Sequence, residues 1–225
     1  DGYLDMTLAP LIDLWDVNGQ GYVPTKEERT AALSFKGVEE LELDDKAGTA
    51  RLPRSGMALD LGALAKGYMA DMLKAFLMER GCTSAVLDLG HNILLIGEKP
   101  GRNPFSIGVR DPEGGEGDIS IVLYARDVSV VTSGTYERFF ERDGVRYAHI
   151  LDPYTGAPAD TGVSSVTIIS LNSLSGDALS TTCLLLGKER GLALIESLEN
   201  VEALFLMEDG TRTMSSGFEA YLEKK

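Results

Sequence analysis

Asp177 and Thr181 place a carboxylate and a hydroxyl four residues apart in the stretch SLSGDALSTTCLLLG, residues 173–187. On a helix this spacing brings both side chains to one face. One interpretation is that these residues, with Ser173 and Ser175, cap the helix entrance and complement its dipole. The other is that the two oxygens bind a cation. Mg²⁺ usually keeps waters or phosphate oxygens beside one or two carboxylates, so this second interpretation requires a phosphate-bearing ligand.

Lys66 is the second candidate, in the stretch ALDLGALAKGYMAD, residues 58–71. We expect a strand that ends at Asp60 and a helix that begins near Ala63, and free N–H groups at such a junction can bind an anion. A lysine in the first turn opposes the helix dipole, which a bound phosphate or a partner carboxylate would explain. The alternative is a solvated lysine on an ordinary strand-to-helix turn.

His149 is the third candidate and one of only two histidines in the chain. A histidine exchanges a proton near neutral pH and can activate a hydroxyl nucleophile, although a hydrogen-bonded structural role is equally open. A hydrolase triad of Ser133, His149 and Asp152 is disfavoured, because Ser133 does not lie in a G-x-S-x-G turn. Taken together, the oxygen pair, the lysine and the histidine suit the metal-assisted cleavage of a pyrophosphate.

The elements that must position these residues alternate between helices and strands. The clearest helix covers residues 63–81, with a row of large apolar side chains at helical spacing: Leu64, Tyr68, Met72 and Phe76. Further helices are predicted at residues 1–16, 25–34, 176–186 and 188–199. Strand candidates are residues 38–45, 49–56, 57–62, 84–90, 92–99, 105–112, 119–134, 136–152, 162–170 and 202–208.

Hairpin signals are frequent among the strands, such as Asp143-Gly144 between two aromatic segments. Crossover helices are too few for a doubly wound parallel sheet. We therefore expect an α+β fold in which antiparallel sheet predominates.

The composition narrows the function classes further. The chain has 225 residues, 44% of them hydrophobic, enough to bury a substantial core in one large domain or two small ones. Its formal net charge of -14 argues against nucleic acid as a partner. The two cysteines, Cys82 and Cys183, form no metal-binding pattern and are expected to be free thiols. No apolar run reaches membrane-spanning length, and the start at Asp1 indicates a processed form or a fragment.

Five stretches in this order resemble the FAD:protein FMN transferase family (ApbE type): LDMTLAPLIDLW, LDLGALAKGYMAD, SAVLDLGHNILLIG, SGTYERFFERDGVRYAHILDPYTGAP and GDALSTTCLLLG. Members cleave FAD with Mg²⁺, attach FMN by a phosphoester to a threonine of a target flavoprotein and release AMP. The resemblance implies a single domain over residues 1–225 with a T-fold-like core, lacking several tens of N-terminal residues. It also implies an extracytoplasmic, often lipid-anchored, protein. With water in place of threonine the same site would be an FAD pyrophosphatase, and a non-catalytic FAD-binding protein is a further alternative.

The resemblance also implies roles for individual residues. The metal ligands would be the main-chain oxygen of Ala63 and the side chains of Asp177 and Thr181. The FAD-binding residues would be Tyr3, Leu4, Asp5, Asp60, Lys66 and Ile150. The histidine that deprotonates the acceptor threonine would be His149.

Four positions depart from the family pattern, of which Leu4 in place of the common phenylalanine and Ala9 in place of the common glycine are mild changes. His91 stands where a second glycine is expected, and its side chain would either crowd the ligand or point outward. Ser180 stands where some members have a second carboxylate, which argues against a two-metal site.

Overall fold

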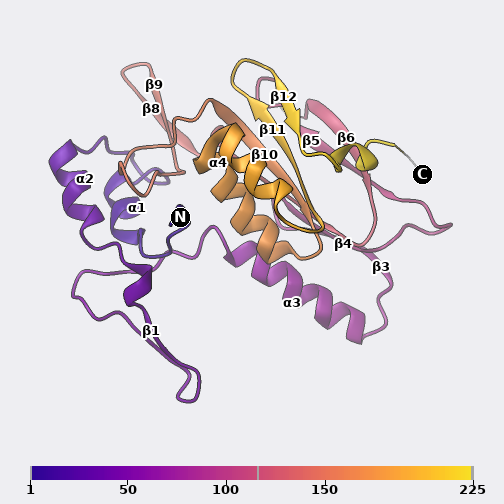
Figure 1. Cartoon of the computed structure of the whole chain (residues 1–225), viewed down its shortest axis with the longest axis horizontal. Helices are drawn as coiled ribbons and strands as arrows, with labels where there is room; N and C mark the ends of the chain where they lie inside the picture. Colours follow the sequence, from indigo (N-terminus) through magenta and orange to yellow (C-terminus); the bar gives the residue numbers. More distant parts are fainter. Residues whose placement is uncertain (1, 116, 224–225) are drawn as a thin grey trace. The chain divides into compact units, whose positions relative to one another are not determined.

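The computed structural model describes residues 2–115 and 117–223 (Figure 1). The chain forms two compact units. Unit 1 comprises Asp1–Leu61 and Glu137–Ala159, and unit 2 comprises Gly62–Tyr136 and Asp160–Lys225. Unit 2 contains most of the regular structure.

A six-stranded sheet forms the centre of unit 2, in the order β12-β11-β10-β7-β4-β3. Its strands are β3 (Ser84–Asp88), β4 (Asn92–Gly97), β7 (Ser129–Gly134), β10 (Val163–Ser170), β11 (Val201–Met207) and β12 (Arg212–Met214). All neighbouring strands run antiparallel. The α+β class with a predominantly antiparallel sheet is thus confirmed.

The two faces of this sheet are covered differently (Figure 1). The helices α3 (Ala65–Glu79) and α4 (Ser173–Glu196) lie on one face, where α4 contacts Val131 and Phe205. Side chains alternate along a strand, so the neighbouring Val130 and Leu204 point the other way. They pack in a core with the hairpin of β5 (Phe105–Arg110) and β6 (Ile119–Ala125) and with the 3-10 turn η2 (Phe218–Tyr221).

Two glycines shape the helical layer of unit 2. A Cβ at Gly67 would lie 2.4 Å from the carbonyl oxygen of Ser173, so only glycine permits α3 to cross α4 this closely. Gly187 has φ 75°, in the left-handed region, and breaks the helical path of α4. The prediction of two consecutive helices that meet at residue 187 is therefore confirmed.

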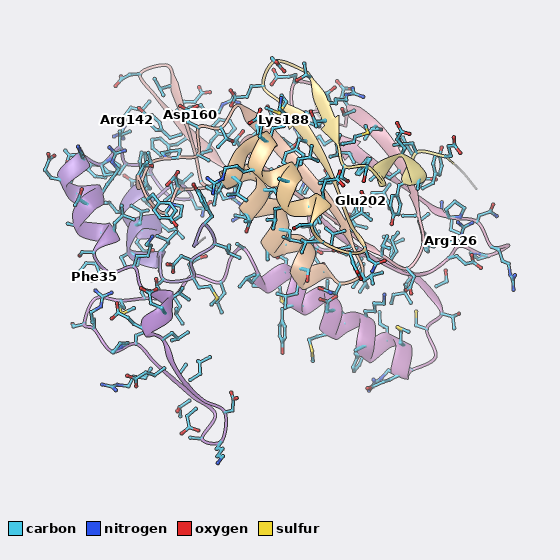
Figure 2. All side chains as sticks on the ribbon, in the orientation of Figure 1. Phe35, Arg126, Arg142, Asp160, Lys188 and Glu202 are labelled. Carbon is cyan, nitrogen blue, oxygen red and sulfur yellow. The ribbon has the colours of Figure 1, made fainter. Side chains whose placement is uncertain are left out.

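The large apolar side chains of α3 correct a sequence-based expectation. Tyr68, Met72 and Phe76 are 56%, 54% and 49% exposed, whereas the buried residues of the helix are Gly67 and Ala70. The helix thus uses its small residues for close packing and leaves its large apolar side chains exposed. Long side chains project from this helix in the view of all side chains (Figure 2).

Unit 1 is built around Trp15 at the end of the short helix α1 (Ala9–Trp15). The indole Nε1 donates to the carbonyl oxygen of Gly156 at 2.8 Å, and the ring packs against Phe140 and Tyr147. These aromatic residues lie on the hairpin of β8 (Phe139–Arg142) and β9 (Val145–Ala148). Its turn has positive φ at both Asp143 and Gly144, as predicted.

The rest of unit 1 carries helix α2 (Lys26–Leu33), the 3-10 turn η1 (Val38–Glu40) and the hairpin of β1 (Glu42–Asp44) and β2 (Thr49–Arg51). Thr25 and Glu28 form the predicted capping box of α2. Residues 57–62 were expected to be a strand and are not one, although the Asp60 N–H donates to the Met6 carbonyl oxygen at 2.8 Å.

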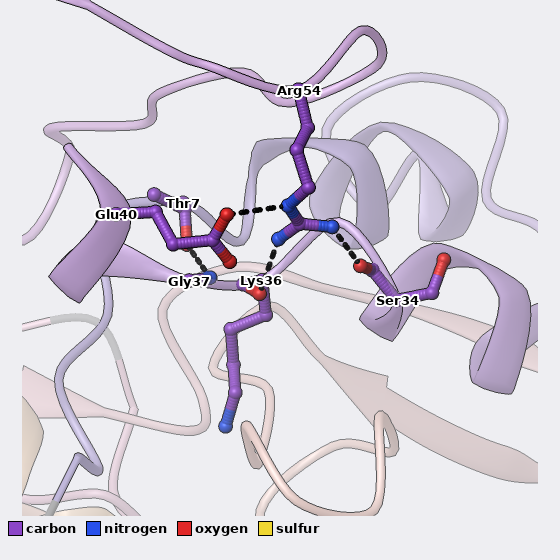
Figure 3. A network of polar contacts seen from close by, with 6 residues as sticks. All are labelled: Thr7, Ser34, Lys36, Gly37, Glu40 and Arg54. Atoms are coloured by element: carbon purple, nitrogen blue, oxygen red, sulfur yellow. Dashed lines mark hydrogen bonds and ion pairs between the residues drawn. The ribbon is translucent and has the colours of Figure 1, made fainter.

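A polar network joins the turns of unit 1 (Figure 3). The Arg54 guanidinium donates to the Glu40 carboxylate at 2.7 Å and to the carbonyl oxygens of Ser34 and Lys36 at 2.6 and 3.0 Å. Close by, the Gly37 N–H donates to the Thr7 hydroxyl at 2.8 Å. Arg54 thereby holds the loop after α2 to the segment after β2.

Both cysteines are free thiols, and burial raises the pKa of Cys183 to about 12. Among the residues described, no helix has the length and apolar character needed to cross a membrane.

Candidate functional site

Two carboxylates stabilise the crossing of α3 and α4 in unit 2. Each helix supplies one carboxylate, which caps the start of the other helix. The Asp71 carboxylate of α3 accepts hydrogen bonds from the N–H groups of Ser173 and Leu174 at 2.8 and 2.9 Å. In return, the Asp177 carboxylate of α4 accepts from the Gly67 N–H of α3 at 2.9 Å. Each carboxylate thus satisfies free N–H groups in the first turn of the other helix.

The expected capping of α4 by its own serines is wrong. The N-cap residue is Asn172, whose side chain accepts from the N–H of Ser175 at 2.9 Å. Ser173 lies in the first turn, and its own N–H is taken by Asp71, a residue 102 positions away. Sequence reasoning missed this cap because it depends on a tertiary contact.

Asp177 is a buried carboxylate, 4% exposed. Burial raises its pKa, while the Gly67 N–H, the nearby Lys66 ammonium and the Asn92 amide lower it. Burial removes the water that would stabilise the charged carboxylate. A cation bound beside it would stabilise the charged form instead.

The start of α3 brings two further predicted residues into this region. The helix begins at Ala65, slightly later than expected, and the Gly67 N–H donates to Asp177 instead of to the carbonyl oxygen of Ala63. Among the described residues, no hydrogen bond reaches that oxygen, which leaves it available as a ligand. Lys66 donates to the carbonyl oxygen of Gly90 at 3.2 Å, so its ammonium lies at the turn between β3 and β4.

Thr181 lies in a cluster of hydroxyl groups on α4 and β7. The Ser133 Oγ is 2.8 Å from the Ser180 Oγ and 3.2 Å from the Thr181 Oγ1. Ser180 also donates to the main-chain oxygen of Asp177 at 3.0 Å. Ser133 is therefore hydrogen-bonded to hydroxyl groups of α4. The sequence did not indicate that it lies beside Thr181.

His91 occupies a tight turn between β3 and β4. Gly90 and His91 have φ 70° and 60°, both in the left-handed region, as in the type I′ turns that favour glycine and asparagine. The His91 side chain is exposed, and its carbonyl oxygen accepts from the Thr132 N–H at 2.8 Å. Of the two expectations for this side chain, the structure supports the outward one.

In unit 1, His149 is oriented by a backbone carbonyl. Its Nδ1 lies 3.1 Å from the main-chain oxygen of Arg138. A carbonyl oxygen only accepts hydrogen bonds, so the neutral ring carries its proton on Nδ1 and keeps a lone pair on Nε2. The Asp152 carboxylate instead accepts from the N–H groups of Tyr154 and Thr155, at 2.7 and 3.0 Å. The contacts of Asp152 are therefore those of a turn.

The residues near the start of the chain also lie in unit 1. Tyr3 packs edge-on against Tyr154, with 5.1 Å between the ring centres, and Lys36 lies 4.4 Å above the Tyr154 ring. Asp5 is buried, and one of its carboxylate oxygens accepts from the N–H and hydroxyl of Thr7, at 2.8 and 2.5 Å.

The remaining predicted residues of unit 1 differ in exposure. Leu4 is half-buried, Asp60 is exposed and Ile150 is 6% exposed. Unit 1 thus holds the predicted flavin-side residues and His149, and unit 2 holds the predicted metal ligands with Lys66. In unit 2, sequence reasoning missed Gly67 and Asn92, and it considered Ser133 only as part of a hydrolase triad.

The donor atoms in unit 2 define the cation that they could bind. The candidate ligands are a carboxylate, a hydroxyl and a main-chain carbonyl, all of them hard oxygens suited to Mg²⁺. Within the described part of the chain, no three His, Cys, Asp or Glu side chains gather as a metal-binding group. The oxygen set contains only one such side chain, Asp177, so other oxygen ligands must complete the coordination shell.

Comparisons with known proteins agree on one family. A model of the ApbE family matches residues 1–205. The FAD:protein FMN transferase of Treponema pallidum is 40% identical over 96% of this chain and 64% of its own length. That of Klebsiella pneumoniae is 37% identical over 96% of this chain and 67% of its own. The chain thus spans about two thirds of the length of these relatives.

Solved structures agree as well. The ApbE protein of Thermotoga maritima superposes with a TM-score of 0.91 at 37% identity, over 99% of this chain and 73% of its own. The flavin transferase ApbE of Vibrio cholerae gives a TM-score of 0.84 at 31% identity, over 98% and 71%. The family model, the relatives and the folds all lead to one conclusion: this chain belongs to the ApbE family.

Proposed function

We propose that the protein is an Mg²⁺-dependent FAD:protein FMN transferase. It cleaves the pyrophosphate of FAD, transfers FMN to a threonine hydroxyl of an acceptor flavoprotein and releases AMP. The relatives named FAD:protein FMN transferase support the reaction class. Mg²⁺ dependence and a threonine target are further parts of this proposal.

The observation that carries the proposal is the contact between Asp177 and the first turn of α3. The hydrogen bond from Gly67 holds the buried carboxylate beside the turn that carries Ala63 and Lys66. One helical turn after Asp177, Thr181 adds a hydroxyl oxygen. A carboxylate, a hydroxyl and an unengaged carbonyl fit Mg²⁺ once phosphate oxygens complete the shell.

Each residue then has a role that its chemistry permits. Ala63, Asp177 and Thr181 would hold Mg²⁺, which supplies charge neutralisation on the pyrophosphate when it is bound. Lys66 would bind the same phosphates from the start of α3. His149 would take the proton of the attacking threonine hydroxyl on Nε2, since Nδ1 is engaged by a carbonyl. The threonine oxygen forms a bond to the FMN phosphorus, and the pyrophosphate P–O bond breaks with its electron pair leaving on AMP.

The test is incubation of the purified protein with FAD, Mg²⁺ and a threonine-containing acceptor, with AMP followed by chromatography and the acceptor by mass spectrometry. We expect AMP and an acceptor heavier by one FMN group. Asp177→Ala should reduce both by at least about 100-fold, since it removes the only carboxylate ligand. Glu141→Ala, on the exposed hairpin of unit 1, serves as the control and should react at the wild-type rate. AMP and FMN without a modified acceptor would indicate a pyrophosphatase instead, and FAD that stays intact would indicate a binding protein.

A further inference from the structure

Asn92 is the first residue of β4 and is fully buried, with 0% exposure. The preceding turn at Gly90 and His91 directs it inward, and the Leu89 N–H closes that turn on the Asn92 carbonyl oxygen at 2.9 Å. A buried asparagine is expensive unless its amide is hydrogen-bonded. Its presence beside two helix starts therefore requires an explanation.

One half of the Asn92 side chain is satisfied. The Ser173 hydroxyl donates to its Oδ1 at 2.6 Å, which fixes the rotation of the amide about its last bond. Because Oδ1 faces Ser173 at the start of α4, Nδ2 points away from Ser173 within the plane of the amide.

The other half lies toward Asp177. The Asn92 amide is near enough to the Asp177 carboxyl group to lower its pKa, yet Nδ2 has no hydrogen bond of normal geometry among the described residues. Asp177 lies one helical turn after Ser173, the residue that already bonds to Asn92, and its carboxylate is the acceptor that this effect identifies.

We propose that Asn92 is a positioning residue for the metal site, an inference that rests on the proposed function. Its Nδ2–H donates to the Asp177 carboxylate when the cation is bound, and the Gly67 N–H holds the same carboxylate at 2.9 Å from α3. Two donors on fixed elements leave the remaining lone pairs of the carboxylate directed at the cation. Donors behind a ligating carboxylate set its orientation and its affinity for the metal.

This role differs from ordinary core packing in what it predicts. If Asn92 only filled space and accepted from Ser173, its replacement would change stability and leave metal affinity alone. If it orients Asp177, an apolar residue of similar volume should weaken metal binding. The same substitution removes the unpaired amide from the core and so does not lower stability in proportion. Stability and metal affinity then change independently.

The experiment measures the affinity of Mn²⁺, a spectroscopic substitute for Mg²⁺, by electron paramagnetic resonance with saturating FAD. Thermal unfolding is recorded in parallel without metal. We expect Asn92→Leu to weaken Mn²⁺ binding about 10-fold or more. Asn92→Ala is a second variant for the case in which leucine does not fit. Ser215→Ala is the matched control, because it removes another buried polar side chain of unit 2 and should leave Mn²⁺ affinity unchanged.

Two outcomes separate failure of this inference from failure of the proposed function. If Asp177→Ala abolishes Mn²⁺ binding while both Asn92 variants bind within twofold of the wild type, the positioning role is wrong and the metal site stands. If Asp177→Ala itself leaves Mn²⁺ affinity unchanged, the metal site of the proposed function is wrong, and the role of Asn92 is overturned with it.

Discussion

Two polar networks hold turns and helix starts in this protein, and they differ in how fully their groups are bonded. In unit 1, Arg54 uses three guanidinium nitrogens in three hydrogen bonds, one of them charge-assisted (Figure 3). In unit 2, the network around Asp177 is more buried and yet leaves the Asn92 Nδ2 without a normal hydrogen bond to any residue that the structure describes.

This difference in hydrogen bonding distinguishes a network that only stabilises the fold from one that belongs to a binding site. A fully bonded network such as that of Arg54 is complete without a ligand, so its value lies in stability. A buried network with an incomplete set of bonds is costly by itself, and such features concentrate where a protein binds or reacts. The substitutions below test this distinction, from the largest expected effect to the smallest.

Gly67→Ala should have the largest effect on stability. The added Cβ would meet backbone atoms of Ser173 and Leu174 at 2.4 and 2.7 Å, so α3 must move away from α4. We expect a loss of about 3 kcal/mol in the free energy of unfolding, measured by urea titration. Met72→Ala, on the exposed face of the same helix, should change it by less than about 0.5 kcal/mol. Equal stability of both variants would contradict the close crossing.

Arg54→Ala should destabilise unit 1 by about 2 kcal/mol, because it removes a charge-assisted bond and two bonds to main-chain oxygens. Arg51→Ala is the matched control, since Arg51 only pairs with Glu42 on an exposed hairpin, and its loss should cost at most about 0.5 kcal/mol. Chemical denaturation followed by tryptophan fluorescence reports on unit 1, where Trp15 is buried. The distinction between the two arginines is lost if both variants unfold at the same midpoint.

Asp177→Asn should stabilise the metal-free protein near neutral pH. Burial raises the pKa of Asp177 above that of the unfolded chain, so the native state holds this proton more tightly. The corresponding stability is present at low pH and is lost as the pH rises through the native pKa, and asparagine avoids that loss. We expect a melting temperature about 2 °C above that of the wild type at pH 7, with the difference vanishing in acid.

The same variant should lose the stabilisation that added Mg²⁺ and FAD give the wild type. A variant that is less stable than the wild type at pH 7 without metal would show that the hydrogen bond to Gly67 outweighs the burial of charge.

His91→Gly should give the smallest change. His91 has φ 60°, which costs a residue with a side chain more than it costs glycine. Because the side chain is exposed, we expect a gain of about 0.5 kcal/mol in the free energy of unfolding and no change in metal affinity. A fall in Mn²⁺ affinity would reveal a contribution of the imidazole to the site that its exposure does not suggest.

Much of the fold was predictable from local signals. Turn signals and changes of period predicted the strands of the antiparallel sheet, Asp143-Gly144 predicted the hairpin of unit 1, and Gly187 separated two helical segments. These features depend on neighbouring residues, whose propensities can be read along the chain.

The features that escaped prediction depend on contacts between distant segments. Asp71 caps a helix 102 residues away, and Gly67 is required by the backbone of that same helix. The apolar row of α3 was recognised correctly as a helical pattern, but spacing alone did not indicate that Tyr68 and Phe76 face outward. Asp177 and Thr181 were candidate ligands from their spacing and Ala63 from the family resemblance, and the structure supplied their surroundings.

The reciprocal caps of α3 and α4 have a consequence for how the protein opens. Neither helix start can fray alone, because Asp71 and Asp177 each hold amide groups of the other helix. The amide hydrogens of Gly67, Ser173 and Leu174 should therefore exchange with deuterium through one common opening, as a single cooperative unit. The turn that carries Lys66 would then become ordered or disordered together with the entrance of α4, over 100 residues further along the chain.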